Sequence, residues 1–255
     1  MIPDFLKKYE SELKKYEREF VKIIVTPIQE NILEDSLGIQ ESKFLGKPFF
    51  PLNKEYPKDL NNKPMILIAQ LNFEEIPKLE HYPKEGILQL FLSSDDWYDD
   101  DYKIVYHTKE ELNKSRIEDF SFLTEKDYDD SPVYMVHSLS FEKSIDKGCS
   151  EDSQFDFQFD GLGYWEFVES LEGDKEEEMD DYFDARIHKI GGYADFTQSD
   201  PRNYEEGKSN DVQLLQIAVD DEIMFGDSGV GHIFIDRENL KNKDFSKAYF
   251  YWDCC

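Results

Sequence analysis

The chain has 255 residues, and its 29 lysines and arginines against 57 aspartates and glutamates give a formal net charge of −28 at pH 7. A protein this acidic lacks the basic surface that a nucleic acid or an anionic membrane would require, so the composition argues against both partners. Leucine, isoleucine, valine and phenylalanine nevertheless make up 69 of the 255 residues, which is enough for a folded core.

The N-terminal segment predicts an amphipathic helix over residues 3–20. Its apolar side chains recur mostly at spacings of three and four residues, as one face of a helix requires. They are Phe5, Leu6, Tyr9, Leu13, Tyr16 and Phe20. We expect this face to pack on the rest of the protein, with docking on a partner as the alternative. The segment lacks the apolar core of a signal peptide, and no window of the chain is apolar enough for a membrane span.

Beyond residue 40, short apolar runs separated by Gly, Pro, Asn and Asp predict strands. The runs are 65–71, 86–92, 103–107, 133–141, 212–219, 231–235 and 248–252. The segment 154–160 alternates phenylalanines with polar residues, which indicates either a half-buried strand or the entry to a loop. Short helices are expected at 27–36, 73–76, 109–114, 120–126, 163–171 and 237–240. Many strands are too close together for helical crossovers. The sequence therefore predicts an α+β fold with a mostly antiparallel β framework and the N-terminal helix packed on it.

Three acidic runs lie between these elements, at 95–101, 127–130 and 174–181. Such runs are typical of solvated loops. They also suggest that the protein presents acidic loops to a basic partner protein, and solubility is the alternative explanation of the same charge. The loop residues expected to carry such binding are Asp95, Asp96, Asp99, Asp100 and Asp101.

Two stretches, 44–92 and 189–236, share one pattern and predict an internal duplication within a single domain that spans residues 1–255. From Gly46 to Gln70 is 24 residues, and from Gly192 to Gln216 is also 24. In each stretch a glycine turn leads to an apolar run with an embedded glutamine, and then to another glycine and another apolar run. Chance similarity between ordinary strands is the alternative.

The two matching glutamines suggest where a binding cleft would lie. A buried amide must satisfy about four hydrogen bonds, so each glutamine is either a clamp on a neighbouring loop or a group that faces a ligand. If they face a ligand, the site is the groove between the repeats. The predicted binding residues, expected to lie close together there, are Gln70, His188, Gln198, Gln216 and Asp227.

No catalytic residue, metal ligand or cofactor is predicted. The segment 226–229 (GDSG) resembles a serine-protease nucleophile segment, but no motif supplies the histidine base, so a turn between strands is the preferred interpretation. The five histidines form no metal-binding motif, and the glycines at 191 and 192 match no phosphate-binding loop. The three cysteines suggest no disulfide framework, which favours a reducing cytoplasm.

Several segments together carry a family resemblance that extends over about residues 40–255. The clearest are 69–71 (AQL), 188–198 (HKIGGYADFTQ) and 225–229 (FGDSG). They resemble the YwqG-like proteins, the DUF1963 family, although Ala194 and Phe225 stand where members often carry Pro and Trp. The resemblance implies a bacterial, cytoplasmic α+β protein with a duplicated β framework. Some members occur beside polymorphic toxin genes, which implies an immunity-like role.

The expected function is therefore non-catalytic. We expect an interaction or immunity-like protein whose acidic surface binds a basic protein. The alternative is a small-molecule-binding protein or an enzyme that uses the cleft between the two repeats.

Overall fold

The computed structural model describes residues 1–29, 31–98, 101–204 and 206–255. A ten-stranded sheet forms its body, and every pairing between its named strands is antiparallel, as predicted. The strands are β1 (Arg18–Gln29), β2 (Lys43–Phe44), β3 (Ile66–Asn72), β4 (Ile87–Leu92), β5 (Tyr102–His107), β6 (Val136–Asp146), β7 (Lys189–Gly191), β8 (Val212–Ile217), β9 (Val230–Ile235) and β10 (Tyr249–Asp253).

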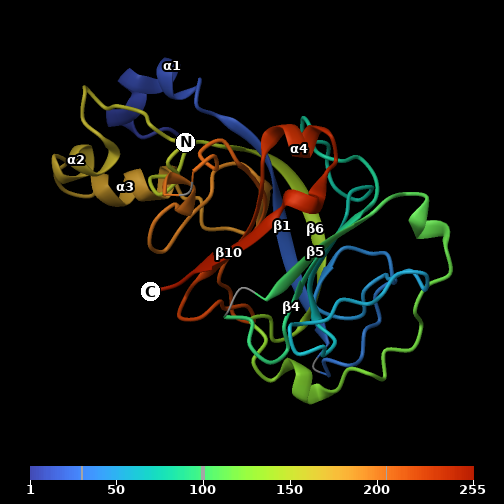
Figure 1. Cartoon of the computed structure of the whole chain (residues 1–255). Helices are drawn as coiled ribbons and strands as arrows, with labels where there is room; N and C mark the ends of the chain where they lie inside the picture. Colours follow the sequence, from blue (N-terminus) through green and yellow to red (C-terminus); the bar gives the residue numbers. More distant parts are fainter. Residues whose placement is uncertain (30, 99–100, 205) are drawn as a thin grey trace.

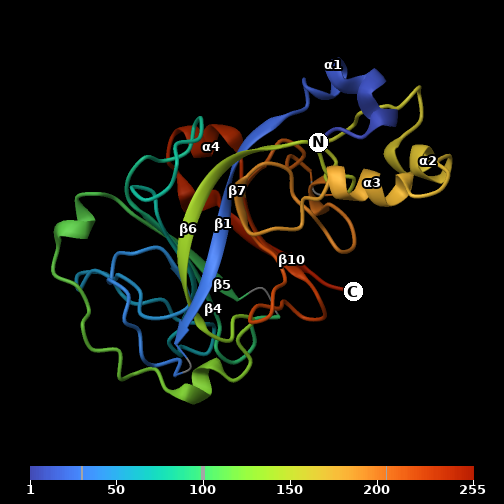
Figure 2. The ribbon, with the colours of Figure 1, turned by 180° about the vertical axis from the view of Figure 1, so that it is seen from behind.

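Two long strands, β1 and β6, run side by side through the middle of the sheet (Figures 1 and 2). Their register extends from Arg18 opposite Asp146 to Gln29 opposite Val136. Five of the six residues 21–26 are β-branched, which favours an extended chain. The register shifts between Pro27 and Gln29, where the proline has no N–H to donate to the ladder.

The sheet curls around the main hydrophobic core, and its edge strands approach one another. The rings of Tyr102 in β5 and Phe250 in β10 have centroids 5.8 Å apart. Trp97, just before β5, contacts Trp252 of β10 at 4.8 Å. Every residue of β3 and β4 is buried, because these strands pack on the main core with one face and on smaller clusters under the surrounding loops with the other.

The helices are short. They are the α-helices α1 (Glu10–Leu13), α2 (Tyr164–Glu169), α3 (Lys175–Tyr182) and α4 (Arg237–Lys241), and the 3₁₀ helices η1 (Asp4–Tyr9), η2 (Glu111–Asn113), η3 (Glu125–Tyr128), η4 (Pro201–Asn203) and η5 (Phe245–Lys247). Within the described ranges, no helix has the length and apolar character that crossing a membrane requires.

The N-terminal helices, α2 and α3 gather at one end of the sheet (Figure 1). We call residues 1–16 and 149–185 the small lobe. It has a hydrophobic core of its own, in which Tyr9 packs edge-on against Phe157 and Phe159 with ring centroids 5.9 and 5.3 Å apart. Leu6 and Leu13 are buried in the same core.

The prediction for the N-terminus is correct only in part. A helical segment is present, but it ends at Leu13, and β1 begins at Arg18. Phe20, which continued the helical spacing, lies in β1, because the β-branched run that follows it extends the chain. The helices also pack within the small lobe rather than across the sheet.

Some of the other predicted elements are confirmed and others are wrong. The seven apolar runs predicted as strands are confirmed, with boundaries shifted by a few residues at most. The helix predicted at 27–36 is wrong, because β1 continues to Gln29, and residues 73–76 form a turn. Residues 154–160 form no strand, because their phenylalanines pack into the core of the small lobe. The acidic run at 174–181 is mostly the helix α3, which buries Met179.

Candidate functional site

Gln70 is fully buried and clamps the chain on both sides of β2. Its Oε1 accepts a hydrogen bond from the backbone N–H of Phe49 at 2.9 Å. Its Nε2 donates to the carbonyl oxygens of Ile39 and Glu41 at 3.0 and 2.8 Å. Gln89 donates to the same Oε1 at 2.8 Å, so the amide is completely used within the protein.

Gln216 does the same for the chain around β7. Its Oε1 accepts from the backbone N–H of Asp195 at 2.9 Å, and its Nε2 donates to the carbonyls of Ala185 and Ile187 at 2.8 and 2.9 Å. Each residue of this clamp lies 146 positions further along the sequence than the corresponding residue of the Gln70 clamp. Of the two interpretations of these glutamines, the hydrogen bonds favour the clamp.

The same offset relates further features of the two halves. The N–H of Asn72 donates to Ser42 Oγ at 2.8 Å, and the N–H of Ala218 donates to His188 Nδ1 at 3.1 Å. Register shifts interrupt β3 between residues 67 and 69 and β8 between residues 213 and 215. The sheet order is also symmetrical about β1 and β6, with β2 to β5 on one side and β7 to β10 on the other.

Each half also buries a lysine beside its glycine turn. Lys43 Nζ lies 2.7 Å from Asp35 Oδ2, and Lys189 Nζ lies 2.9 Å from Asp146 Oδ2. The same carboxylate oxygens accept the backbone N–H groups of Lys47 and Tyr193. The two lysines are 146 positions apart, although the carboxylates come from unrelated parts of the chain.

The five predicted binding residues have separate surroundings. In the described part of the chain, no hydrogen bond joins any two of them. His188 packs against the ring of Phe44, with centroids 5.7 Å apart, and its Nε2 lies 3.5 Å from Asp220 Oδ2. Asp227 is exposed, and its carbonyl accepts the N–H of Cys255 at 3.3 Å. Asp227 thus lies at the surface, whereas the two clamp glutamines are buried.

Gln198 lines a large cavity. Its backbone N–H donates to Asp253 Oδ2 at 2.8 Å, and its Nε2 donates to the Cys254 carbonyl at 2.7 Å. The C-terminal strand therefore braces the loop that follows β7. The cavity beside this loop has a volume of about 590 Å³ and lies against the small lobe.

We call this cavity the acidic pocket. Among the described residues, its wall combines four carboxylates with a single cation, Arg186. The carboxylates are those of Glu151, Asp180, Asp184 and Asp195. The other lining residues are Cys149, Ser150, Tyr164, Trp165, Phe183, Ala185, Phe196, Thr197 and Gln198. The pocket thus carries an excess of negative charge.

Asp195 is the best-fixed carboxylate of the acidic pocket. Gln216 holds its backbone, Arg186 Nε donates to its Oδ2 at 2.6 Å, and the Cys149 thiol lies 3.8 Å from its Oδ1. The matching position in the first half is Phe49, which is buried with Ile87 and Leu112. Equivalent clamps therefore place an apolar side chain in one half and a carboxylate in the other.

The charge of the acidic pocket is incompletely balanced. Burial raises the pKa of Asp195, even though the nearby Arg186 guanidinium lowers it. Burial also raises the pKa of Glu151, and the negative charge of Asp195 raises it further. The pKa of the Cys149 thiol is raised well above its usual value by burial and by Asp195, which makes this cysteine a poor nucleophile.

An aromatic side chain lies at the same pocket. Trp165 is 53% exposed although it is one of the largest apolar side chains, and its ring lies 5.2 Å from that of Tyr164. An exposed indole beside carboxylates can bind a cation with its π face while the carboxylates neutralise the charge. The arrangement suits a guanidinium or ammonium group.

Apart from Gln198, the acidic pocket was missed in the sequence. Its carboxylates come from separate segments, at 151, 180–184 and 195, which only the tertiary fold brings together. Two signals were available: Asp195 lies in the segment 188–198 that carried the family resemblance, and Asp180 lies in an acidic run.

The acidic run at 95–101 is partly tied to its surroundings. Asp95 pairs with Lys63 at 2.5 Å, and Asp101 Oδ2 accepts the N–H of Leu60 at 2.7 Å. Trp97 is buried, whereas Asp96 is exposed. Asp99 and Asp100 lie outside the described residues.

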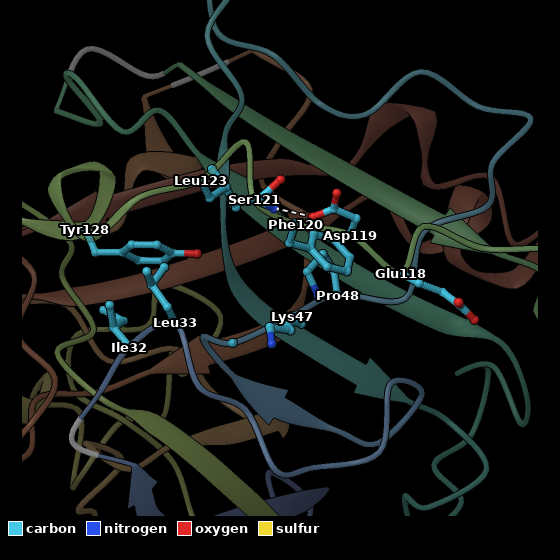
Figure 3. Close-up of a pocket in the computed structure, with 11 residues that line it drawn as sticks. Ile32, Leu33, Lys47, Pro48, Glu118, Asp119, Phe120, Ser121, Leu123 and Tyr128 are labelled. Atoms are coloured by element: carbon cyan, nitrogen blue, oxygen red, sulfur yellow. Dashed lines mark hydrogen bonds between the residues drawn. The ribbon is translucent and has the colours of Figure 1, made fainter.

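A second cavity, of about 280 Å³, has a wall of mixed polar and apolar side chains (Figure 3). Ile32, Leu33 and Tyr128 lie on one side of it, and Phe120 and Pro48 lie on the other. The carboxylate of Asp119 accepts the backbone N–H of Ser121 at 2.9 Å, so it is used locally. In the described part of the chain, no group of three or more His, Cys, Asp or Glu residues is placed to hold a metal ion.

These features define a class of protein: an α+β protein built on a curved antiparallel sheet of symmetrical strand order, with an acidic pocket at one end. The model of a domain of unknown function, DUF1963, matches residues 42–254, and the chain belongs to this family. No curated protein matches the chain.

Proposed function

We propose that this protein is a non-catalytic binding protein that receives a basic side chain of a partner protein in its acidic pocket. The observation that carries the proposal is the set of four carboxylates against one guanidinium. The raised pKa values of Asp195 and Glu151 fit a pocket in which an added cation would be stabilised. Trp165 would cover the cation with its ring.

The net charge of the chain supports the same kind of partner. A formal charge of −28 accelerates encounter with a basic protein and disfavours acidic ones. In biological terms the proposal is an immunity-like protein of the bacterial cytoplasm, which masks a basic partner.

We infer that the two halves of the sheet arose by internal duplication. The constant offset of 146 between the clamp residues supports this inference, because unrelated loops would have no reason to keep it. Asp195 in the place of Phe49 would then be a change that turned a structural position into a binding position.

The proposal can be tested by NMR titration with blocked arginine (N-acetyl-arginine amide) and its neutral isostere, blocked citrulline. We expect the arginine compound to bind at least roughly tenfold more tightly, because a charge-assisted hydrogen bond contributes more than a neutral one. Shifted signals should include the indole N–H of Trp165. Equal binding of the two compounds would contradict the proposal.

Two variants have matched controls elsewhere on the surface. Trp165→Ala and Glu151→Gln should each weaken arginine binding several-fold. Tyr204→Ala removes an aromatic ring that is even more exposed, and Glu142→Gln removes an exposed carboxylate of β6. Both controls should bind arginine like the unaltered protein. An equal loss in test and control variants would indicate general attraction to an acidic surface.

A second candidate function is small-molecule binding, which the partly apolar cavity near Tyr128 favours over the cleft between the repeats. A fragment screen by thermal shift tests it. Stabilising fragments should lose their effect in Ser121→Trp, which fills the cavity from an exposed position, and keep it in Trp165→Ala. A screen without stabilising fragments would count against this candidate.

A further inference from the structure

Two arginines of this acidic protein have no carboxylate partner among the residues that the structure describes. Three of its five arginines form ion pairs with Asp or Glu: Arg116, Arg186 and Arg202. Arg18 and Arg237 form none with the residues that the structure describes. With about twice as many acidic as basic side chains in the chain, two unpaired guanidinium groups are unexpected.

The two guanidinium groups meet at one oxygen atom. Arg18 Nη1 lies 3.1 Å from Gln154 Oε1, and Arg237 Nη2 lies 3.5 Å from the same atom. The amide of Gln154 is fixed from behind, because its Nε2 donates to the carbonyls of Ser209 and Asp211 at 3.0 and 2.9 Å. The two positive charges are thus held close together around a neutral acceptor.

Both arginines line a cavity of about 310 Å³ beside the turn that ends β7. The Arg18 guanidinium lies over the ring of Tyr193 at 3.8 Å, which fixes its plane. Tyr82 donates its hydroxyl to the carbonyl of Gln213 at 2.5 Å. Burial raises the pKa of this phenol, and the charges of Arg237 and Arg18 oppose the shift, so both act on the same wall of the cavity.

The turn at Gly191 leaves room in this cavity. Its φ is +75°, and a Cβ at this position would lie 3.2 Å from Leu79 Cδ1 and 3.3 Å from the Tyr82 hydroxyl. A side chain there would be strained and would crowd the cavity wall.

The carboxylates at the rim do not neutralise the two arginines. Glu19 pairs with Lys143 at 2.9 Å. Glu80 is mostly in solvent, with 84% of its side chain exposed, and its Oε1 lies 3.7 Å from His81 Nε2. The positive charge of the cavity is therefore available to a ligand.

We propose that this cavity binds the oxyanion group, a phosphate or a carboxylate, of a small organic anion. Two guanidinium forks offer several N–H donors at one place, which suits both groups. Leu79 and Val212 line the same cavity and would contact an apolar part of the ligand. The site shares no lining residue with the acidic pocket and does not depend on the function proposed for that pocket.

Isothermal titration at low ionic strength tests the proposal with three probes of similar size: phenyl phosphate, benzoate and benzyl alcohol. We expect one or both anions to bind, with the tighter one identifying the preferred group, and the alcohol not to bind. Arg237→Gln should weaken anion binding at least roughly tenfold, as expected for loss of a charge-assisted hydrogen bond. Arg237 is exposed and its replacement should leave the fold intact.

Arg116→Gln is the matched control, because it removes an arginine charge elsewhere and should leave anion affinity unchanged. Arg237→Lys should recover only part of the affinity, since it keeps the charge but loses the planar fork. Failure of both anions to bind at millimolar concentration would overturn the proposal. So would binding that survives in Arg18→Gln combined with Arg237→Gln, provided that circular dichroism shows this variant to be folded.

Discussion

The side chain of Gln216 forms hydrogen bonds with the backbone of residues 185, 187 and 195. These are the same three bonds that the side chain of Gln70 forms with the backbone of residues 39, 41 and 49. Each amide uses both its oxygen and its nitrogen to fix chain that would otherwise be irregular. In the second half the fixed chain carries Asp195 into the acidic pocket. The clamp is therefore structural in both halves, and in one half it also positions a carboxylate of the acidic pocket.

Replacing either glutamine with leucine should destabilise the fold. Gln70→Leu and Gln216→Leu each leave one buried N–H and two carbonyls without this partner, so we expect a loss of about 3 kcal/mol in the free energy of unfolding. Urea unfolding measures it. Only Gln216→Leu should also weaken the binding of blocked arginine, which makes Gln70→Leu its matched control. Equal effects of the two variants on arginine binding would show that Gln216 has no specific role in positioning the acidic pocket.

The buried pair of Lys43 and Asp35 gives a second prediction. Both side chains are almost completely inaccessible, and burial lowers the pKa of Lys43. Lys43→Met leaves a buried carboxylate uncompensated and should cost about 3–5 kcal/mol. Lys43→Met combined with Asp35→Asn should recover much of this loss, because the amide oxygen can still accept from the N–H of Lys47.

A urea-unfolding double-mutant cycle provides the measurement, and the corresponding cycle at Lys189 and Asp146 is its internal comparison. We expect coupling in both cycles. Additive losses would show that the two charges do not depend on one another.

The sequence predicts most of the sheet, because fully buried strands such as β3 and β4 are continuous apolar runs. It also indicates the clamps, because a glutamine inside such a run must find partners. It does not predict β1, since Phe20 continues a helical spacing into a β-branched strand. Nor does it predict the acidic pocket or the cavity at Arg18 and Arg237, whose residues come together only through tertiary packing of distant segments.

Acid should destabilise the fold through two buried histidines. Burial lowers the pKa of His107 to about 4 and that of His232 to about 3, against an ordinary value of 6.5. Below pH 6.5 the unfolded chain binds protons that the folded protein excludes, so stability falls as pH is lowered towards these values. The contribution of each histidine is on the order of 3 kcal/mol. Urea unfolding between pH 7 and pH 4 measures the slope.

The carboxylates of the acidic pocket have the opposite effect on how the stability of the fold depends on pH. The raised pKa values of Asp195 and Glu151 mean that the folded protein binds their protons first, which stabilises it as pH falls. His107→Gln should therefore flatten the loss of stability in acid, and Asp195→Asn should steepen it. An unchanged pH slope in His107→Gln would contradict the assignment of this histidine as neutral and buried.

The last prediction distinguishes the role of the acidic loops from that of the acidic pocket by the kinetics of partner binding. An immobilised oligoarginine peptide serves as the basic partner, and surface plasmon resonance gives its association and dissociation rates. Replacing Asp95, Asp96 and Asp101 with Asn should slow association, because exposed charges act mainly by steering the encounter. Trp165→Ala should instead accelerate dissociation, because it removes a contact of the bound state.

The dependence of the rates on salt concentration is the control that distinguishes the loops from the pocket. The Debye length falls from roughly 30 Å at ~0.01 M to roughly 8 Å at ~0.15 M salt, so the association rate should fall steeply over this range. The loop variant should show a weaker salt dependence than the unaltered protein, while Trp165→Ala keeps the full dependence. If the loop variant associates at the unaltered rate at every salt concentration, the loop charges serve solubility alone. The acidic pocket would then remain as the part of the surface that we propose to recognise a basic partner.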